Sequence, residues 1–297
     1  MLRISFILLF FGGLLAATSD QSVPGQDTYI EIEDLYDSNG LPEGYKAYIK
    51  TAVCESENCY IVQIHFFWDL IGRFQRFDTL PGEGLTKLDH IPFTDLDYQK
   101  LDVLLKDESS PLANYSKEDL VRDTRSSEID GFTGATIQEI KERVISGGVY
   151  SCHTLWHIAH GEVIDSLQVR TYAALDSALV EQIVSQQDQA MNYFLIQYFS
   201  DQDFLTYLPQ FLKTFTQSSG YYAKNALERM PSTAVCDPLS QAFFARHFNH
   251  LNYFAQVALL KKLNRDTLLP ALAKILEQAL DERSSARNAL IKDLIDG

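Results

Sequence analysis

Seven consecutive residues, Asp130 to Thr136, have the types and spacing that could hold a phosphate group. They read Asp-Gly-Phe-Thr-Gly-Ala-Thr and directly precede a pattern typical of a helix. Gly131, Gly134 and Ala135 leave space around the backbone, and Thr136 supplies a hydroxyl at the expected helix N-terminus. Because unpaired N–H groups and the helix dipole favour anions there, the segment indicates a phosphate site.

This segment resembles the D-G-x-[ST]-G-A-T motif of FMN-binding domains, whose last threonine carries FMN through a phosphoester made by a separate flavin transferase. The resemblance implies that Thr136 is the flavinylated residue and that Asp130 contributes to recognition by the transferase. The rest of the cofactor-binding loop would be Gly131, Thr133, Gly134 and Ala135. Such domains occur in sodium-pumping NADH:quinone reductases, Rnf complexes and related extracytoplasmic electron carriers. The resemblance therefore implies an electron-transfer component with a redox partner protein, not a stand-alone enzyme.

Thr136 also has an interpretation that needs no cofactor. Residues 136 to 139, Thr-Ile-Gln-Glu, fit a capping box in which the threonine hydroxyl accepts from the backbone N–H of Glu139. Such a cap contributes about 1 kcal/mol to stability. A cap does not call for small residues at 131, 134 and 135, which favour close approach of another group. Three hypotheses stay open: a covalent flavin carrier, a domain that binds flavin or another ligand non-covalently, and a non-catalytic protein-interaction scaffold.

Three histidines follow at helical spacing, with a tryptophan among them. His153, His157 and His160 stand at i, i+4 and i+7, so their side chains share one face of the expected helix. Two imidazoles one turn apart can chelate a metal, but Thr154 occupies the place where a zinc protease helix has glutamate. The stripe is also typical of a partly buried face with one histidine bonded to backbone and Trp156 in the core. A third alternative is that one imidazole tunes the flavin.

Four cysteines divide into a close pair and two distant ones. Cys54 and Cys59 have four residues between them and lie between two β-like segments, which favours a disulfide across a hairpin loop in an oxidising compartment. Cys152 and Cys236 fall in different expected regions, and their state stays open. The cysteine spacing predicts neither a zinc cluster nor a c-type haem site.

The N-terminal residues have the layout of a secretory signal peptide over residues 1–18. A basic start is followed by an apolar segment from Ile4 to Leu15 and then by small residues. We therefore expect a periplasmic or secreted protein with no transmembrane segment after cleavage. The net charge of −15 and the lack of Lys/Arg-rich segments argue against nucleic acid as a partner.

Residues 28–165 predict an α+β domain of the FMN-binding type. Alternating or β-rich segments predict strands at 29–33, 45–53, 60–68 and 73–77, with the second and third forming an antiparallel hairpin. Helices are expected at 95–105, capped by Thr94, and at 137–145 and 149–160.

Residues 170–297 predict an all-α domain. Apolar residues recur at three- and four-residue spacing, and prolines divide the pattern into some seven or eight helices, including 175–184, 190–199, 204–215, 223–230, 239–247, 253–263 and 268–280. Short helices in such series resemble HEAT-type repeats, which stack into a solenoid. This resemblance implies a protein-binding surface, where a redox partner would dock.

Overall fold

The computed structural model describes residues 28–53, 61–87, 90–116, 140, 142–281 and 284–296. The chain forms two compact units. The first comprises the described residues of Met1–Tyr36 and Glu43–Leu167, and the second those of Asp37–Pro42 and Gln168–Gly297. The first unit combines a sheet with helices and the second is helical, so an α+β region is followed by an all-α region.

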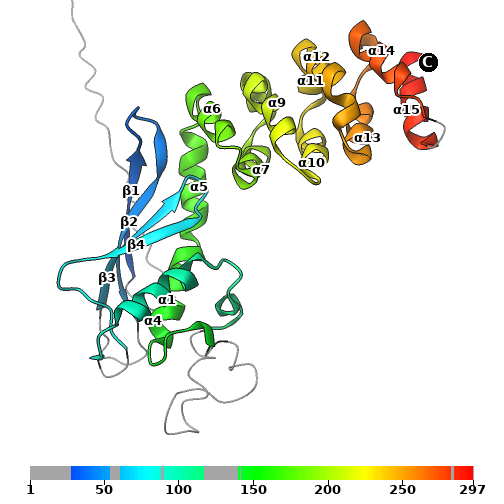
Figure 1. The fold of residues 1–297 in the computed structure, drawn as a ribbon. Helices are drawn as coiled ribbons and strands as arrows, with labels where there is room; N and C mark the ends of the chain where they lie inside the picture. Colours follow the sequence, from blue (N-terminus) through cyan, green and yellow to red (C-terminus); the bar gives the residue numbers. More distant parts are fainter. Residues whose placement is uncertain are drawn as a thin grey trace, which may run out of the picture. The chain divides into compact units, whose positions relative to one another are not determined.

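The first unit is built on a four-stranded antiparallel sheet (Figure 1). Its strands follow chain order and are β1 (Tyr29–Tyr36), β2 (Pro42–Ala52), β3 (Ile61–Asp69) and β4 (Phe74–Thr79). The expected hairpin is confirmed, since β2 and β3 pair from Gly44↔Asp69 to Ala52↔Ile61. The fourth expected strand is also confirmed, because β4 pairs with β3.

One face of the sheet supports the hydrophobic core of the first unit. Alternate residues of β2 and β3 are buried, as the period-2 side-chain arrangement of a strand requires. Helices α1 (Asp95–Lys106) and α4 (Val149–His160) supply the opposing layer, with the short 3-10 helix η2 (Pro111–Asn114) beside α4. The Trp68 ring of β3 donates from Nε1 to the Ala159 carbonyl of α4 at 2.9 Å, which joins sheet and helix within the core.

The start of α1 agrees with the sequence prediction. Thr94 is the N-cap, its hydroxyl accepts from the Asp97 backbone N–H, and the Asp97 carboxylate accepts from the Thr94 backbone in return. This reciprocal capping box satisfies two backbone donors that a helix start leaves unpaired.

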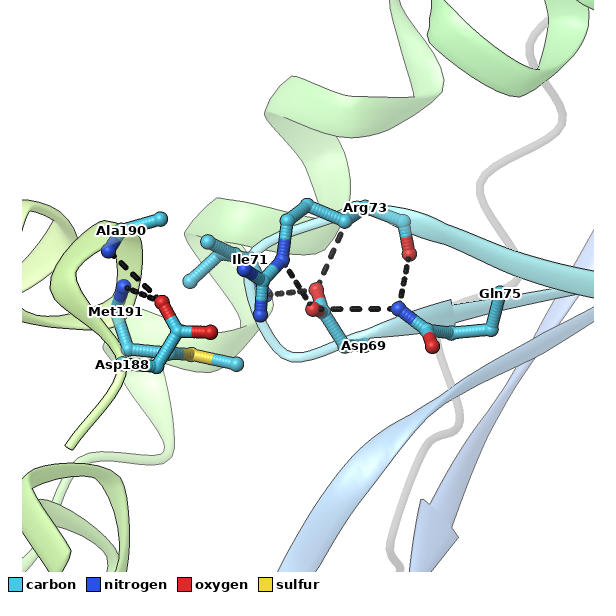
Figure 2. Close-up of polar contacts among 7 residues, drawn as sticks. All are labelled: Asp69, Ile71, Arg73, Gln75, Asp188, Ala190 and Met191. Carbon is cyan, nitrogen blue, oxygen red and sulfur yellow. Dashed lines mark hydrogen bonds and ion pairs between the residues drawn. The ribbon is translucent and has the colours of Figure 1, made fainter. Parts of the chain in front are cut away.

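The turn between β3 and β4 is ordered around one carboxylate. Asp69 Oδ1 accepts from the backbone N–H groups of Ile71 and Arg73, and its Oδ2 accepts from Arg73 Nε at 2.6 Å (Figure 2). Gly72 occupies the left-handed region with φ +85°, where a Cβ would meet the Ile164 side chain at 2.8 Å. Glycine at this position therefore allows the tight reversal.

The second unit contains ten α-helices among its described residues, in addition to the end of α5 (Val163–Ala173). The ten are α6 (Ser177–Ser185), α7 (Gln189–Tyr198), α8 (Asp201–Thr206), α9 (Leu208–Gln217), α10 (Tyr222–Arg229), α11 (Ser232–Val235), α12 (Pro238–His247), α13 (Tyr253–Lys262), α14 (Pro270–Gln278) and α15 (Ser285–Ile295). Two 3-10 helices complete the unit: η3 (Phe248–His250) and η4 (Arg265–Thr267). Side-chain caps begin several of these helices, as at α7, where Asp188 accepts from the N–H groups of Ala190 and Met191 (Figure 2).

The helices of the second unit follow one another in a series (Figure 1), and they recur at a regular spacing along the sequence. Helices α7, α10, α13 and α15 begin at Gln189, Tyr222, Tyr253 and Ser285, at intervals of 31 to 33 residues. Each of the first three is followed by a short helix of three to six residues (α8, α11 or η4) and then by a longer helix (α9, α12 or α14). The unit is therefore a series of similar helical modules, each packed mainly on its sequence neighbours.

Side chains from each module bond to backbone groups of the module before it. Arg229 at the end of α10 donates to the Phe199 carbonyl at the end of α7 at 2.6 Å. Lys262 at the end of α13 donates in the same way to the carbonyls of Glu228, at 2.7 Å, and Met230. These cations satisfy carbonyls that a helix C-terminus leaves unpaired, at the end of the dipole that favours positive charge.

Two sequence expectations for the helices are corrected. The single helix expected at 204–215 is two helices, α8 and α9, separated at Tyr207, because Pro209 has no N–H to continue the first. Helix α5 is not predicted, because its β-branched residues lower helix propensity and burial in the fold decides its conformation.

Candidate functional site

The residues expected to carry the cofactor lie outside the described part of the chain. Asp130, Gly131, Thr133, Gly134, Ala135 and Thr136 all belong to this set, as do Cys54 and Cys59 of the expected disulfide. The described residues on either side of the motif are Ser116 before it and Ile140 after it. The structure therefore describes the two flanks of the motif, the residues before it and the residues after it.

The downstream flank is anchored in the core of the first unit. Ile140 is helical and only 1% exposed, and its carbonyl accepts from the Val144 N–H at 2.9 Å. Lys100 of α1 donates from Nζ to the Val144 carbonyl at 2.5 Å, and Arg143 pairs with Asp107 at 2.9 Å. Lys100 of α1 and Asp107, the residue after α1, thus hold Val144 and Arg143, which follow the motif in the sequence.

The upstream flank is held by four side chains of α4, which we call the ladder. Each donates a ring N–H to a backbone carbonyl of residues 105–115. The pairs are His160 to Leu105 (2.8 Å), Trp156 to Asp107 (2.9 Å), His157 to Leu112 (3.1 Å) and His153 to Tyr115 (2.8 Å). The expectation of one backbone-bonded histidine therefore extends to all three, and Trp156 is buried as expected.

The ladder fixes the protonation of its imidazoles at one nitrogen. A carbonyl oxygen only accepts, so Nε2 of His153, His157 and His160 must carry a hydrogen. The rings also contact one another: the centroids of His153 and His157 are 4.2 Å apart, and Trp156 lies 4.7 Å from His160. In the neutral state the remaining hydrogen-bond acceptor of each ring is Nδ1.

A metal centre finds no support among the described residues. No group of three or more His, Cys, Asp or Glu side chains there has the arrangement to hold a metal ion. The ladder explains this for its histidines, because the Nε2 atoms that would bind a metal are committed to carbonyls.

Cys152, next to the ladder, is a buried thiol and not a nucleophile. Its side chain is fully buried and its sulfur accepts from the Ile145 N–H at 3.5 Å. Burial raises the pKa of the Cys152 thiol to about 12, although the Ile145 N–H and Lys100 act in the opposite direction. At neutral pH it is therefore protonated. Cys236 is also a free thiol, in the second unit.

The second unit exposes aromatic side chains at equivalent places in two successive modules. Tyr221 precedes α10 and is 60% exposed, while Tyr253 and Phe254 begin α13 and are 44% and 52% exposed. The rings of Tyr221 and Phe254 contact each other with centroids 5.7 Å apart. Asn252 joins the same two places by donating to the Gly220 carbonyl. We call these three side chains the aromatic edge.

The sequence indicates the histidine stripe and Trp156 but not their partners. The accepting carbonyls come from a segment 38 to 55 residues earlier, and a backbone carbonyl has no sequence signal. The aromatic edge could not be predicted, because exposed and buried aromatic residues can stand at the same spacing in the sequence. Its detectable signal is two tyrosines 32 residues apart, Tyr221 just before one helix and Tyr253 at the start of another.

Comparison with known proteins returned no relative. No protein-family model, no curated protein and no solved structure matches the chain. In the described part of the chain, no helix has the length and apolar character needed to span a bilayer.

Proposed function

We propose that the protein is an extracytoplasmic flavoprotein that carries FMN covalently on Thr136 and transfers electrons between redox partners. The observation that carries this proposal is the seven-residue motif at 130–136. The described residues support it in one respect. Ile140, four positions after Thr136, is helical and buried, so this position belongs to the core of the first unit.

The proposed modification joins Thr136 Oγ1 to the FMN phosphate as a phosphoester, with net loss of one water. A flavin transferase would make this bond, and Asp130 would contribute to its recognition of the segment. Gly131, Gly134 and Ala135 leave room for the nucleotide to approach the backbone. FMN supplies the redox chemistry through its isoalloxazine ring, so the protein has to attach, expose and tune it. A covalent bond also keeps the flavin on a periplasmic or secreted protein, where a dissociated cofactor is lost.

The proposal also assigns a fold to each unit and a partner to the second unit. The first unit would be an FMN-binding-like domain, and the second a HEAT-like domain that docks the redox partner protein. The regular helical modules support the second assignment, because stacked helical modules commonly bind proteins along an extended surface. The aromatic edge is the surface that we assign to this docking, since contiguous exposed aromatic residues are typical of protein interfaces.

Intact mass spectrometry tests the flavin assignment. Protein co-expressed with an active flavin transferase should gain the mass of one FMN less one water, and its flavin fluorescence should survive denaturing electrophoresis. Thr136→Ala should abolish both signals. The matched control is Thr94→Ala, which also removes a threonine at a helix start but should keep the flavin. Unmodified wild-type protein, alongside a modified control substrate, would contradict the proposal.

A second candidate function is a protein-interaction scaffold without a covalent cofactor. The aromatic edge and the helical modules favour it independently of the motif. Under this alternative Thr136 is only a helix cap, and Thr136→Ala lowers stability by about 1 kcal/mol while leaving partner binding unchanged. Loss of the flavin mass with unchanged stability would instead favour the flavoprotein.

A further inference from the structure

Asn114 is the last residue of the 3-10 helix η2, and its side chain is exposed to solvent. Two neighbouring residues contact the core of the first unit instead: Leu112 is only 1% exposed, and Tyr115 packs against the buried cluster. The chain becomes extended directly after Asn114, with φ −120° and ψ 132° at Tyr115. Asn114 therefore lies on the surface at the point where a short helix ends.

The backbone around Asn114 is held without any contribution from its side chain. The Tyr115 N–H donates to the Leu112 carbonyl at 3.2 Å, which closes the turn. Two bonds of the ladder also hold the carbonyls of Leu112 and Tyr115 on α4. In the described part of the chain, no hydrogen bond joins the Asn114 side-chain amide to another residue. A group attached to this amide would therefore extend into solvent and displace no core contact.

Asn114, Tyr115 and Ser116 form the acceptor pattern for N-glycosylation, Asn-x-Ser with a middle residue other than proline. No other asparagine of the chain has serine or threonine two positions later. Such acceptors lie in surface loops of secreted proteins, because an attached oligosaccharide is large and hydrophilic. Asn114 meets this requirement, which a fully buried asparagine such as Asn192 would not. The signal peptide expected over residues 1–18 would bring the segment to the lumenal compartment in which the transfer takes place.

We propose that Asn114 is the acceptor of an N-linked oligosaccharide, transferred from a polyprenyl diphosphate carrier by an oligosaccharyltransferase. In this step Asn114 Nδ2 forms a bond to the anomeric carbon of the first sugar, and the bond from that carbon to the diphosphate breaks. The polyprenyl diphosphate leaves, the amide releases one proton, and no atom is oxidised or reduced. The transferase recognises the Ser116 hydroxyl together with the amide, and it acts on the chain before folding is complete. This inference goes beyond the proposed function and does not depend on the flavin.

Translation of the full chain with microsomal membranes tests the proposal. Chains that resist added protease have entered the lumen, and they should carry one oligosaccharide that peptide N-glycosidase removes. After this treatment, peptide mapping should find aspartate at position 114, because the enzyme hydrolyses the glycosylated amide. Asn114→Gln and Ser116→Ala should each abolish the modification, whereas Ser116→Thr should retain it. These results do not depend on whether a variant folds, because the transfer precedes folding.

The matched control is Asn249→Gln. Asn249 is also exposed on a 3-10 helix, η3, but Leu251 stands two positions later, so this variant should be glycosylated like the wild type. If the chain does not enter the lumen by itself, the leader of a known glycoprotein in place of residues 1–18 carries it there. Protected chains that stay unmodified, while a control glycoprotein in the same reaction is modified, would overturn the proposal. Modification that persists in Asn114→Gln would overturn it as well.

Discussion

Replacement of Gln241 by leucine should destabilise the junction between two helical modules. Gln241 is 1% exposed and makes three bonds to backbone groups. Its amide nitrogen donates to the carbonyls of Cys236 (2.8 Å) and Thr267 (2.9 Å), and its oxygen accepts from the Leu269 N–H (2.7 Å). It therefore ties the start of α12 to the turn that begins α14. Leucine has a similar size but replaces none of these bonds.

The magnitude follows from the number of bonds lost. Each contributes about 1 kcal/mol net, so Gln241→Leu should lower the free energy of unfolding by about 3 kcal/mol. Because stacked modules are stabilised mainly by their neighbours, the loss should fall on α13, α14 and α15 before the rest of the unit.

Urea unfolding followed by circular dichroism measures the total loss, and hydrogen exchange of α14 locates it. The matched control is Gln202→Leu at an exposed position of α8, where one weak bond to Thr206 is lost, and we expect a change within about 0.5 kcal/mol. A loss below about 1 kcal/mol for Gln241→Leu, or a loss spread evenly over both units, would refute the reasoning.

Three further predictions follow from individual side chains. Partial burial raises the pKa of the Asp97 carboxyl, but the bond from Lys87 and the bonds of the Thr94 cap lower it by more. The carboxyl therefore has a pKa of about 2, below its ordinary value of 3.8. Its stabilising contribution is therefore present above pH 3.8 and lost as the pH falls towards 2, and acid unfolding of Asp97→Asn should lack this component. Cys152 should resist maleimide labelling at about pH 8 until the protein is unfolded, and rapid native labelling would contradict its burial. Tyr221→Ser with Phe254→Ser should leave the thermal midpoint almost unchanged but weaken partner binding at least tenfold in a pull-down titration.

The helices and strands could be predicted where local sequence decides them. Alternation in β2 and β3 and the Thr94 capping box give the hairpin and α1 directly, because period and cap chemistry are local properties. The four-residue helix α11 was not predicted, since one helical turn leaves too few residues for a periodic pattern, and residues 204–206 of α8 were expected to continue into α9. Helix α5 is decided by burial of Leu167 and Thr171, which sequence does not reveal.

The ladder shows a second limit of sequence reasoning. Its residue types are visible, but the choice between a metal site and a structural bond depends on what lies opposite the imidazoles. Here the C-terminal carbonyls of α1 and the turns after it lie opposite, and such carbonyls lack partners inside their own helix. Histidine is suited to them because Nε2–H reaches a carbonyl from a neighbouring helix. The spacing predicts a shared face, and only the fold identifies its partner.

The charge of the chain is unevenly divided, which bears on how a partner would bind. Residues 1–167 contain 13 Lys and Arg against 27 Asp and Glu, whereas residues 168–297 contain 12 against 13. Residues 1–167, all assigned to the first unit except 37–42, thus carry −14 of the net charge of −15, and long-range steering of a charged partner would act through them. The aromatic edge belongs to the nearly neutral second unit, where binding would depend on apolar contact. Docking at that edge should therefore persist when added salt screens the acidic unit, whereas association through the first unit should weaken with salt.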